Sequence, residues 1–208
     1  MESVEIYNIV GWDIAKRLAL RTEGKKPKTA FPTRAWKLKS LIAEHSHIKA
    51  VQYCIDIDNL RQWVGVHLLR HPFVLPYISS QRSDRTEDAE KVLSLISEDI
   101  TKDPDFKKEN WRDYRLQGSP NNHTFIVNAQ TLINISRKRL CRCASKETRQ
   151  VWEQVKQVLA RQDAELAEVM VPNCIYRGFC PEMKSCGYTK TKEFKERLEH
   201  YQSLTREE

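Results

Sequence analysis

Alternation of polar and apolar residues marks two stretches of the chain as strands. Residues 2–10 alternate in this way, and in residues 49–57 the apolar positions fall on one face. Residues 73–80, directly after Pro72, form a third stretch that is extended and apolar. The pattern therefore predicts short strands that contribute to a small sheet.

Apolar residues at helical spacing cover much of the remaining chain. Helices are predicted for residues 11–22, 33–47, 58–71, 86–100, 144–170 and 190–206, while residues 123–140 form a helix or a turn that enters one. Side chains suited to capping precede several of these helices, namely Thr33, Asp58, Asp84 or Thr86, and Ser145. The expected fold class is α+β, with a small central antiparallel or mixed sheet flanked by helices.

We expect a single domain over residues 1–208, because no internal repeat and no long linker divides the chain. The chain has 208 residues, of which 40% are hydrophobic, and this is enough for one compact core. Within that domain, residues 170–188 form a Cys-rich tail and the charged helix 190–206 follows it.

The charge of the chain points to an acidic partner. The formal net charge is +7, and the basic residues are spread without a long Lys/Arg tract, so a small phosphorylated ligand is as consistent as nucleic acid. No apolar run approaches the roughly 18 residues of a membrane span. The first ten residues also lack the layout of a signal peptide. We expect a cytoplasmic protein with no membrane partner.

Residues 67–85 combine two candidate binding features. His67, Arg70 and His71 are three and four residues apart, which places them on one face of a predicted helix. The segment after the extended stretch offers a hydroxyl, an amide and a guanidinium, which suit an anion such as phosphate. These groups belong to Ser80, Gln81 and Arg82. The alternative interpretation is a solvated loop whose charges serve solubility.

Residues 128–139 carry polar side chains among aliphatic neighbours. Carboxamides donate to and accept from the edges of a planar heterocycle, while aliphatic side chains cover its faces. The polar set consists of Asn128, Gln130, Asn134 and Arg139. Helix capping and surface hydrogen bonding are the alternative, although Asn is a poor residue in the middle of a helix.

The first of these segments resembles the signature of flavin-dependent thymidylate synthases. That signature reads Arg-His-Arg, seven residues, Ser, and an Arg two positions further on. Arg70, His71, Ser80 and Arg82 match it at the same spacing.

The second segment resembles the same family. Asn128, Asn134 and Arg139 match one of its helices, and the tail that follows matches at Ala144, Glu147 and Arg149. His45 and His47 lie where the family has a His-containing loop. The resemblance covers about residues 34–150, and shorter, diverged members of the family end in a similar Cys-rich tail.

The resemblance implies an FAD-dependent methyltransferase with the fold of thymidylate synthase-complementing proteins. NADPH would reduce FAD, methylenetetrahydrofolate would supply one carbon, and C5 of dUMP would receive it to give dTMP. Family members are homotetramers whose sites combine several subunits, so the site residues need not all meet within one chain.

The resemblance also implies roles for individual residues. Ser80 and Arg82 would hold the nucleotide phosphate, and Arg139 would stabilise negative charge on the uracil ring. The full substrate set is His67, Arg70, Ser80, Gln81, Arg82 and Arg139. The FAD set is His45, His47, Arg70, His71, Asn128, Gln130 and Asn134.

The chain departs from the family pattern at four positions. Pro72 and Gln130 replace arginines, and Tyr77-Ile78 replaces an Asn-Glu pair. These changes imply weaker or altered flavin binding, or a different nucleotide. Use of dCMP and formation of a hydroxymethyl product, as in a hydroxymethylase, both stay open.

Five of the six cysteines lie in two short segments. Cys141 and Cys143 form a CxC pair, and Cys174, Cys180 and Cys186 follow at intervals of six. Neither spacing is the tight C-x₂-C knuckle of a zinc site, so we expect no metal and assign these residues to buried thiols and a packed loop. Thiolate ligation of zinc or of an iron–sulfur cluster is the alternative.

A different class of protein also accounts for part of these observations. A basic nucleic-acid-binding module with a metal-stabilised, Cys-rich end would explain the charge and the cysteines. The aromatic residues, however, are not interleaved with the basic ones as stacking platforms would be. We therefore favour the enzyme.

Overall fold

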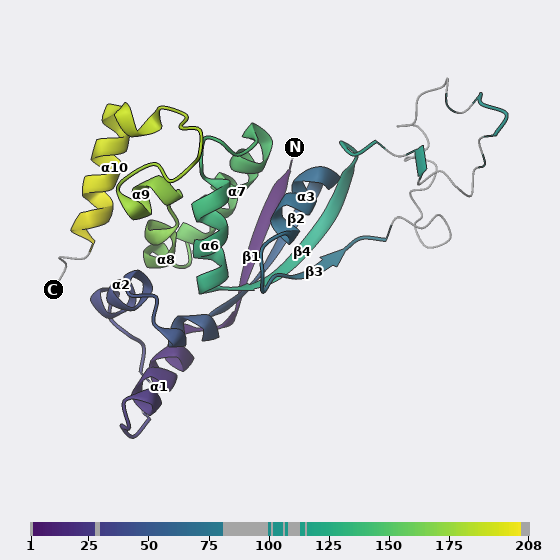
Figure 1. Cartoon of the computed structure of the whole chain (residues 1–208). Helices are drawn as coiled ribbons and strands as arrows, with labels where there is room; N and C mark the ends of the chain where they lie inside the picture. The colour runs from purple at the N-terminus through teal and green to yellow at the C-terminus, as the bar shows by residue number, and fades with distance from the viewer. Residues whose placement is uncertain are drawn as a thin grey trace.

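The computed structural model of the chain describes residues 2–27, 30–80 and 116–204, together with residues 100, 102–105, 107, 113 and 114. A sheet lies in the middle, the helices α6 to α10 gather at one side of it, and α1 and α2 lie at one of its ends (Figure 1). This arrangement confirms the predicted α+β class.

The sheet has four strands in the order β1-β2-β4-β3, and every pairing is antiparallel. The strands are β1 (Ser3–Val10), β2 (Gln52–Arg61), β4 (Pro120–Asn128) and β3 (Leu75–Ile78). Because β4 is central and leads directly into α6, the residue that joins them sits at one end of the sheet.

The two faces of the sheet differ in burial. Ile6, Ile55 and Phe125 are cross-strand partners on one face and all three are buried beneath helices. On the other face, Tyr7 and Leu75 are 51% and 57% exposed, so within the described part of the chain this face is largely uncovered. One-sided burial is the pattern that antiparallel sheets permit.

The helices begin where the local chemistry favours them. Thr33, Asn128, Ser145, Asp163 and Thr191 each accept a backbone hydrogen bond at a helix N-terminus. The α-helices are α1 (Trp12–Thr22), α2 (Arg34–Ile42), α3 (Gln62–Leu69), α6 (Ala129–Arg139), α7 (Lys146–Ala160), α8 (Ala164–Val169), α9 (Asn173–Arg177) and α10 (Lys192–Ser203). Two short 3-10 helices are η1 (Ser46–Ala50) and η3 (Tyr188–Lys190).

A buried carboxylate joins distant parts of the core. Asp163 is 3% exposed and accepts hydrogen bonds from Trp12 Nε1 and, at 2.5 Å, from the hydroxyl of Tyr53. Lys37 Nζ lies 3.8 Å from the same carboxylate. Because a buried charge is costly without partners, these contacts fix α1, α2 and β2 around the start of α8.

Several sequence predictions are confirmed, including β1, α1, the caps Thr33 and Ser145, and the extended stretch that contains β3. The helix predicted for residues 86–100 lies, apart from residue 100, outside the described residues. Among the described residues, no helix is both long enough and apolar enough to cross a membrane.

Three predictions of secondary structure were wrong. Asp58 does not cap a helix, because β2 continues to Arg61 through pairing with β1 and β4. Residues 123–128 belong to β4, and the helix starts only at Ala129. The long helix 144–170 breaks after Ala160, where Asp163 caps the separate helix α8.

Candidate active site

Arg139 joins the two segments that the sequence singled out. Its Nη2 donates to the backbone oxygen of His67 at 2.6 Å, and its Nε donates to Nε2 of His71 at 3.0 Å. The end of α6 is thereby fixed against the end of α3. Two of the three guanidinium nitrogens are engaged, so the direction of the cation is set by the protein.

His71 must be neutral to take part in this contact, because its Nε2 accepts a hydrogen bond. Burial, with the Arg139 charge next in size, lowers the pKa of His71 to about 4. At neutral pH the ring therefore carries no charge and its proton sits on Nδ1.

A chain of hydrogen bonds also holds the ring of His67 in place. Ser145 Oγ donates to Thr148 Oγ1 at 2.7 Å, and Thr148 Oγ1 lies 3.1 Å from Nδ1 of His67. This chain orients the His67 ring and leaves Nε2 as the ring nitrogen that can face a ligand. Burial, and then the charges of Arg139 and Arg70, lowers the pKa of His67, which favours the neutral ring.

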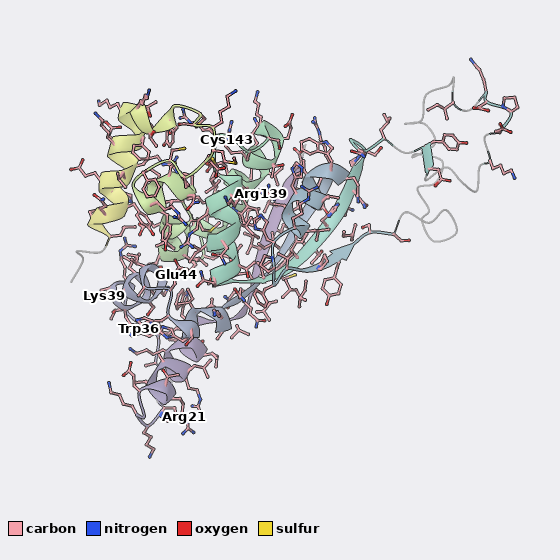
Figure 2. All side chains as sticks on the ribbon, viewed as in Figure 1. Arg21, Trp36, Lys39, Glu44, Arg139 and Cys143 are labelled. Carbon is pink, nitrogen blue, oxygen red and sulfur yellow. The ribbon has the colours of Figure 1, made fainter. Side chains whose placement is uncertain are left out.

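A second polar cluster runs along α6 from Gln130 to Arg137 and includes Glu44 (Figure 2). Glu44 accepts hydrogen bonds from Gln130 Nε2 at 2.6 Å and from Arg137 Nη2. Burial alone would raise the pKa of Glu44, but the hydrogen bonds from Arg137 and Gln130 outweigh it and lower that pKa. Asn134 Oδ1 accepts from both Gln130 and Arg137, so the group that Asn134 can offer a ligand is its amide N–H.

Flat rings stack beside this cluster. The rings of Trp36 and His47 are 4.9 Å apart with 26° between their planes, and His45 stacks on His47 at 5.6 Å. Nε2 of His47 is buried and has no hydrogen-bond partner among the residues that the structure describes. Burial, followed by the effect of His45, lowers the pKa of His47.

The remaining predicted residues occupy different positions. Asn128 caps α6 by accepting from Thr131 N at 2.8 Å, so its oxygen has a structural use. Arg70 is exposed at the C-terminus of α3, next to His71. Gln81 and Arg82 lie outside the described residues.

Ser80 lies at the opposite end of the sheet from Asn128. The neighbouring Ser79 N donates to Asn122 O at 3.0 Å, and Asn128 follows Asn122 by six positions along β4. At about 3.3 Å per residue this is a separation of about 20 Å. Within one chain, Ser80 therefore does not meet Asn128.

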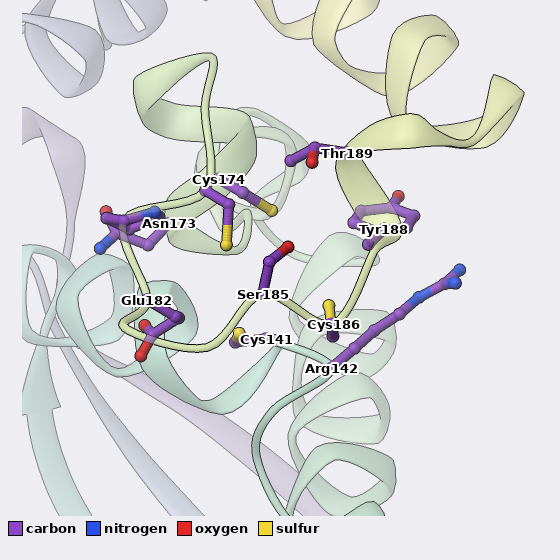
Figure 3. A pocket seen from close by; sticks show the side chains of 11 residues that line it. Cys141, Arg142, Asn173, Cys174, Glu182, Ser185, Cys186, Tyr188 and Thr189 are labelled. Carbon is purple, nitrogen blue, oxygen red and sulfur yellow. The ribbon is translucent and has the colours of Figure 1, made fainter.

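The cysteines gather in one place. Cys141, Cys174, Cys180 and Cys186 line a single cavity (Figure 3), and all six cysteines are free thiols. Among the described residues, no group of three or more His, Cys, Asp or Glu side chains is arranged to hold a metal ion as it stands. Cys54 lies on β2, apart from the other five.

Sequence reasoning missed Glu44, Arg137 and Thr148. Glu44 directly precedes the His45 loop, and Thr148 follows its cap Ser145 by three residues. Their roles depend on partners far along the chain, because 93 positions separate Glu44 from Arg137 and 81 separate His67 from Thr148.

Comparisons with known proteins define the fold. No family model matches the sequence, and no curated protein matches it. Two structures of the flavin-dependent thymidylate synthase ThyX from Helicobacter pylori, each with FAD and dUMP, match it in three dimensions. Their TM-scores are 0.63 and 0.61 at 15% and 16% identity, covering 81% and 80% of this chain and 99% of each ThyX chain.

A third structure broadens the chemistry that this fold supports. The UMP/dUMP methylase PolB from Streptomyces cacaoi, bound with 5-Br dUMP, matches with a TM-score of 0.60 at 15% identity. The match covers 86% of this chain and 96% of PolB. The chain therefore has the ThyX fold, in a diverged form, and its structural neighbours are enzymes that act on pyrimidine nucleotides.

Proposed function

We propose that this protein is a flavin-dependent enzyme that transfers a one-carbon unit from methylenetetrahydrofolate to C5 of a pyrimidine nucleotide, converting dUMP to dTMP. NADPH would serve as the reductant and the cytoplasm as the compartment. The observation that carries the proposal is the contact of Arg139 with His67 and His71. It unites both halves of the family signature in a protein with the ThyX fold.

The neutral histidines and the oriented cation suit an anionic, ring-shaped substrate. Arg139 would stabilise the negative charge that develops on the pyrimidine ring when C5 reacts, since an oriented cation needs no reorganisation at that moment. The Nε2–H of His67 would donate to an oxygen of the nucleotide. Ser80, Gln81, Arg82 and Arg70 complete the proposed substrate set.

The donor set near the start of α6 fits a flat cofactor such as FAD. The stacked His45 and His47 rings offer a flat surface, and the buried Nε2 of His47 lacks a partner among the described residues. Asn134 offers N–H, and Gln130 offers its oxygen because its nitrogen is bound to Glu44. The residues that would hold FAD are His45, His47, Arg70, His71, Asn128, Gln130 and Asn134. When bound, FAD supplies the hydride that completes the methyl group.

The proposal includes a homo-oligomer, for which a tetramer is the expected form. Ser80 is about 20 Å of strand away from Asn128 within one chain. A complete site therefore requires the phosphate motif of a second subunit. The exposed Tyr7, Leu75 and Tyr77 on the open face of the sheet provide apolar surface for such an association.

The test first measures bound flavin by its absorbance and then measures the mass of the nucleotide product. Full-length protein mixed with FAD and gel-filtered should retain an absorbance band near about 450 nm, as bound oxidised flavin does. With methylenetetrahydrofolate and NADPH, dUMP should then gain the mass of one CH2 unit, because a methyl group replaces the hydrogen at C5. UMP and dCMP in parallel reactions define the nucleotide. A protein that retains no flavin and leaves all three nucleotides unchanged would contradict the proposal.

A further inference from the structure

Five cysteines from two distant segments meet beyond the end of α6. Four of them, Cys141, Cys174, Cys180 and Cys186, line one cavity (Figure 3). The fifth, Cys143, follows Cys141 by two residues, and its Sγ donates to Lys184 O at 3.7 Å. The tertiary structure thus brings together cysteines whose spacing in the sequence does not indicate a common site.

Burial does not explain how the loop between Gly178 and Gly187 is held in place. Its largest apolar side chains point outward, since Phe179 is 57% exposed and Met183 is fully exposed. Both flanking glycines have positive φ, at +78° and +79°, so the backbone turns sharply at each end. The Lys138–Glu182 ion pair at 3.4 Å is largely solvent-exposed and adds little.

The loop contacts the rest of the protein through Cys143 Sγ, which donates to Lys184 O at 3.7 Å, and through the thiols that line the cavity. Cys180 and Cys186 belong to the loop, Cys174 to α9, and Cys141 to the turn after α6. A link through these four side chains would fasten the loop and α9 to the turn before α7. Small, loop-rich regions with little core commonly use such a link.

The size of the cavity limits what can form that link. Its volume is about 10 Å³, which is room for about one water-sized particle. A single ion fits this space, whereas a cluster of several iron and sulfide ions does not. Four sulfur ligands around one ion match the tetrahedral, all-thiolate environment that zinc prefers.

We propose that Cys141, Cys174, Cys180 and Cys186 bind one structural zinc ion. The four thiols lose their protons to solvent as the ion enters, so the site has a net charge of −2. The sulfurs do not surround a single point in the structure. Binding of the ion therefore requires rotation about the one side-chain bond of each cysteine and adjustment of the loop. Cys143, whose Sγ donates to Lys184 O at 3.7 Å, stays outside the ligand set.

The test measures metal on the full chain and does not depend on the proposed enzyme activity. Protein purified under reducing conditions without chelator should contain one equivalent of zinc by elemental mass spectrometry. After the zinc is removed with a chelator, titration with Co²⁺ should give one equivalent of binding with the intense thiolate-to-cobalt absorption and the visible bands of tetrahedral cobalt.

Matched cysteine variants assign the ligands. Cys174→Ser and Cys186→Ser should each weaken zinc binding by about 100-fold or more, beyond the roughly 10–100-fold that losing an outer contact costs. Cys54→Ser and Cys143→Ser should keep one equivalent. Wild-type protein without zinc and without the cobalt absorption would overturn the proposal, as would thiols found paired in disulfides. Zinc loss in Cys143→Ser alone would overturn the ligand assignment.

Discussion

His123 is a buried side chain that carries no hydrogen bond. It is 1% exposed, and neither ring nitrogen has a partner among the described residues. Burial lowers the pKa of His123 to about 4 from its ordinary 6.5. The folded protein therefore keeps this ring neutral over a range of pH in which the unfolded chain would protonate it.

Acid should destabilise the protein through His123, as it should through His71, whose pKa is also lowered to about 4. The unfolded chain binds a proton at His123 below pH 6.5, whereas the folded protein does so only below about 4. Stability should therefore fall as the pH drops through this window, by about 3 kcal/mol in total. Urea unfolding at about pH 7 and about pH 4.5 measures the effect. His123→Leu should show a smaller loss between the two pH values; an equal loss would contradict the assignment.

Gly65 is the residue on α3 that lets His123 fit. A Cβ at position 65 would lie 2.3 Å from His123 Cε1 and 2.7 Å from its Nδ1. No real contact is so short, so any larger residue must push the helix from the sheet.

Gly65→Ala should therefore destabilise the protein by about 1–3 kcal/mol, although helix propensity alone predicts a gain of about 1 kcal/mol. The free energy of unfolding, measured in urea, shows whether Gly65→Ala stabilises or destabilises the protein. Gly118→Ala is the matched control, since a Cβ there meets no atom within 4 Å. If the clash is the cause, Gly65→Ala should cost less in a His123→Ala background than in the wild type.

At the scale of elements, α6 carries polar groups of both clusters of the candidate site, the one around Arg139 and the one around Glu44. Its first turns carry Gln130 and Asn134, and its last residue is Arg139. Trp152 Nε1 of α7 donates to Ser136 Oγ on α6 at 2.8 Å, inside the core. This contact sets the position of α7, and with it Thr148, relative to His67 on α3.

The geometry at the end of α6 makes Arg139 hard to replace. Arg139→Lys keeps the positive charge but a lysine cannot reproduce the two directed hydrogen bonds to His67 and His71. We expect nucleotide turnover to fall by about 10²–10³-fold with little change in melting temperature. Steady-state kinetics and thermal unfolding measure the two effects. Arg21→Lys, an exposed arginine on α1, is the control; full activity of Arg139→Lys would remove the role of the guanidinium.

At the scale of the whole molecule, two observations favour association with a second copy of the chain. They are the open face of the sheet and the separation between Ser80 and Asn128. Tyr77 is 60% exposed on the edge strand β3, and Ser80 follows that strand away from α6. A second copy of the chain would cover apolar surface and bring a phosphate motif to Arg139.

Mixing inactive variants tests this sharing of sites. Arg82→Ala and Arg139→Ala should each be inactive alone, because each removes one part of every site. Co-expressed with different tags and purified as a mixed oligomer, they should regain roughly a quarter of the wild-type rate, because some sites receive both intact residues. Mixed oligomers without activity would indicate that each site is built from a single chain.

Elements with a strong local pattern were predictable from the sequence. The alternation in residues 2–10 and the capping residues Thr33 and Ser145 were read correctly, because strand periodicity and a cap involve neighbours along the chain. The strand limits were not predictable. Asp58 looks like a helix cap until Ser3, 55 positions away, pairs with it and extends β2.

The sequence by itself determined the α+β class, most of the helices, and the identity of the polar residues that match the flavin-dependent family. Only the tertiary structure decided that Arg139 meets His71 across 68 positions, that Gly65 packs against His123, and that four cysteines from two segments line one cavity. The physical reason is that local propensity depends on a few neighbouring residues, whereas a site forms through contacts whose partners are chosen by the packing of the whole core.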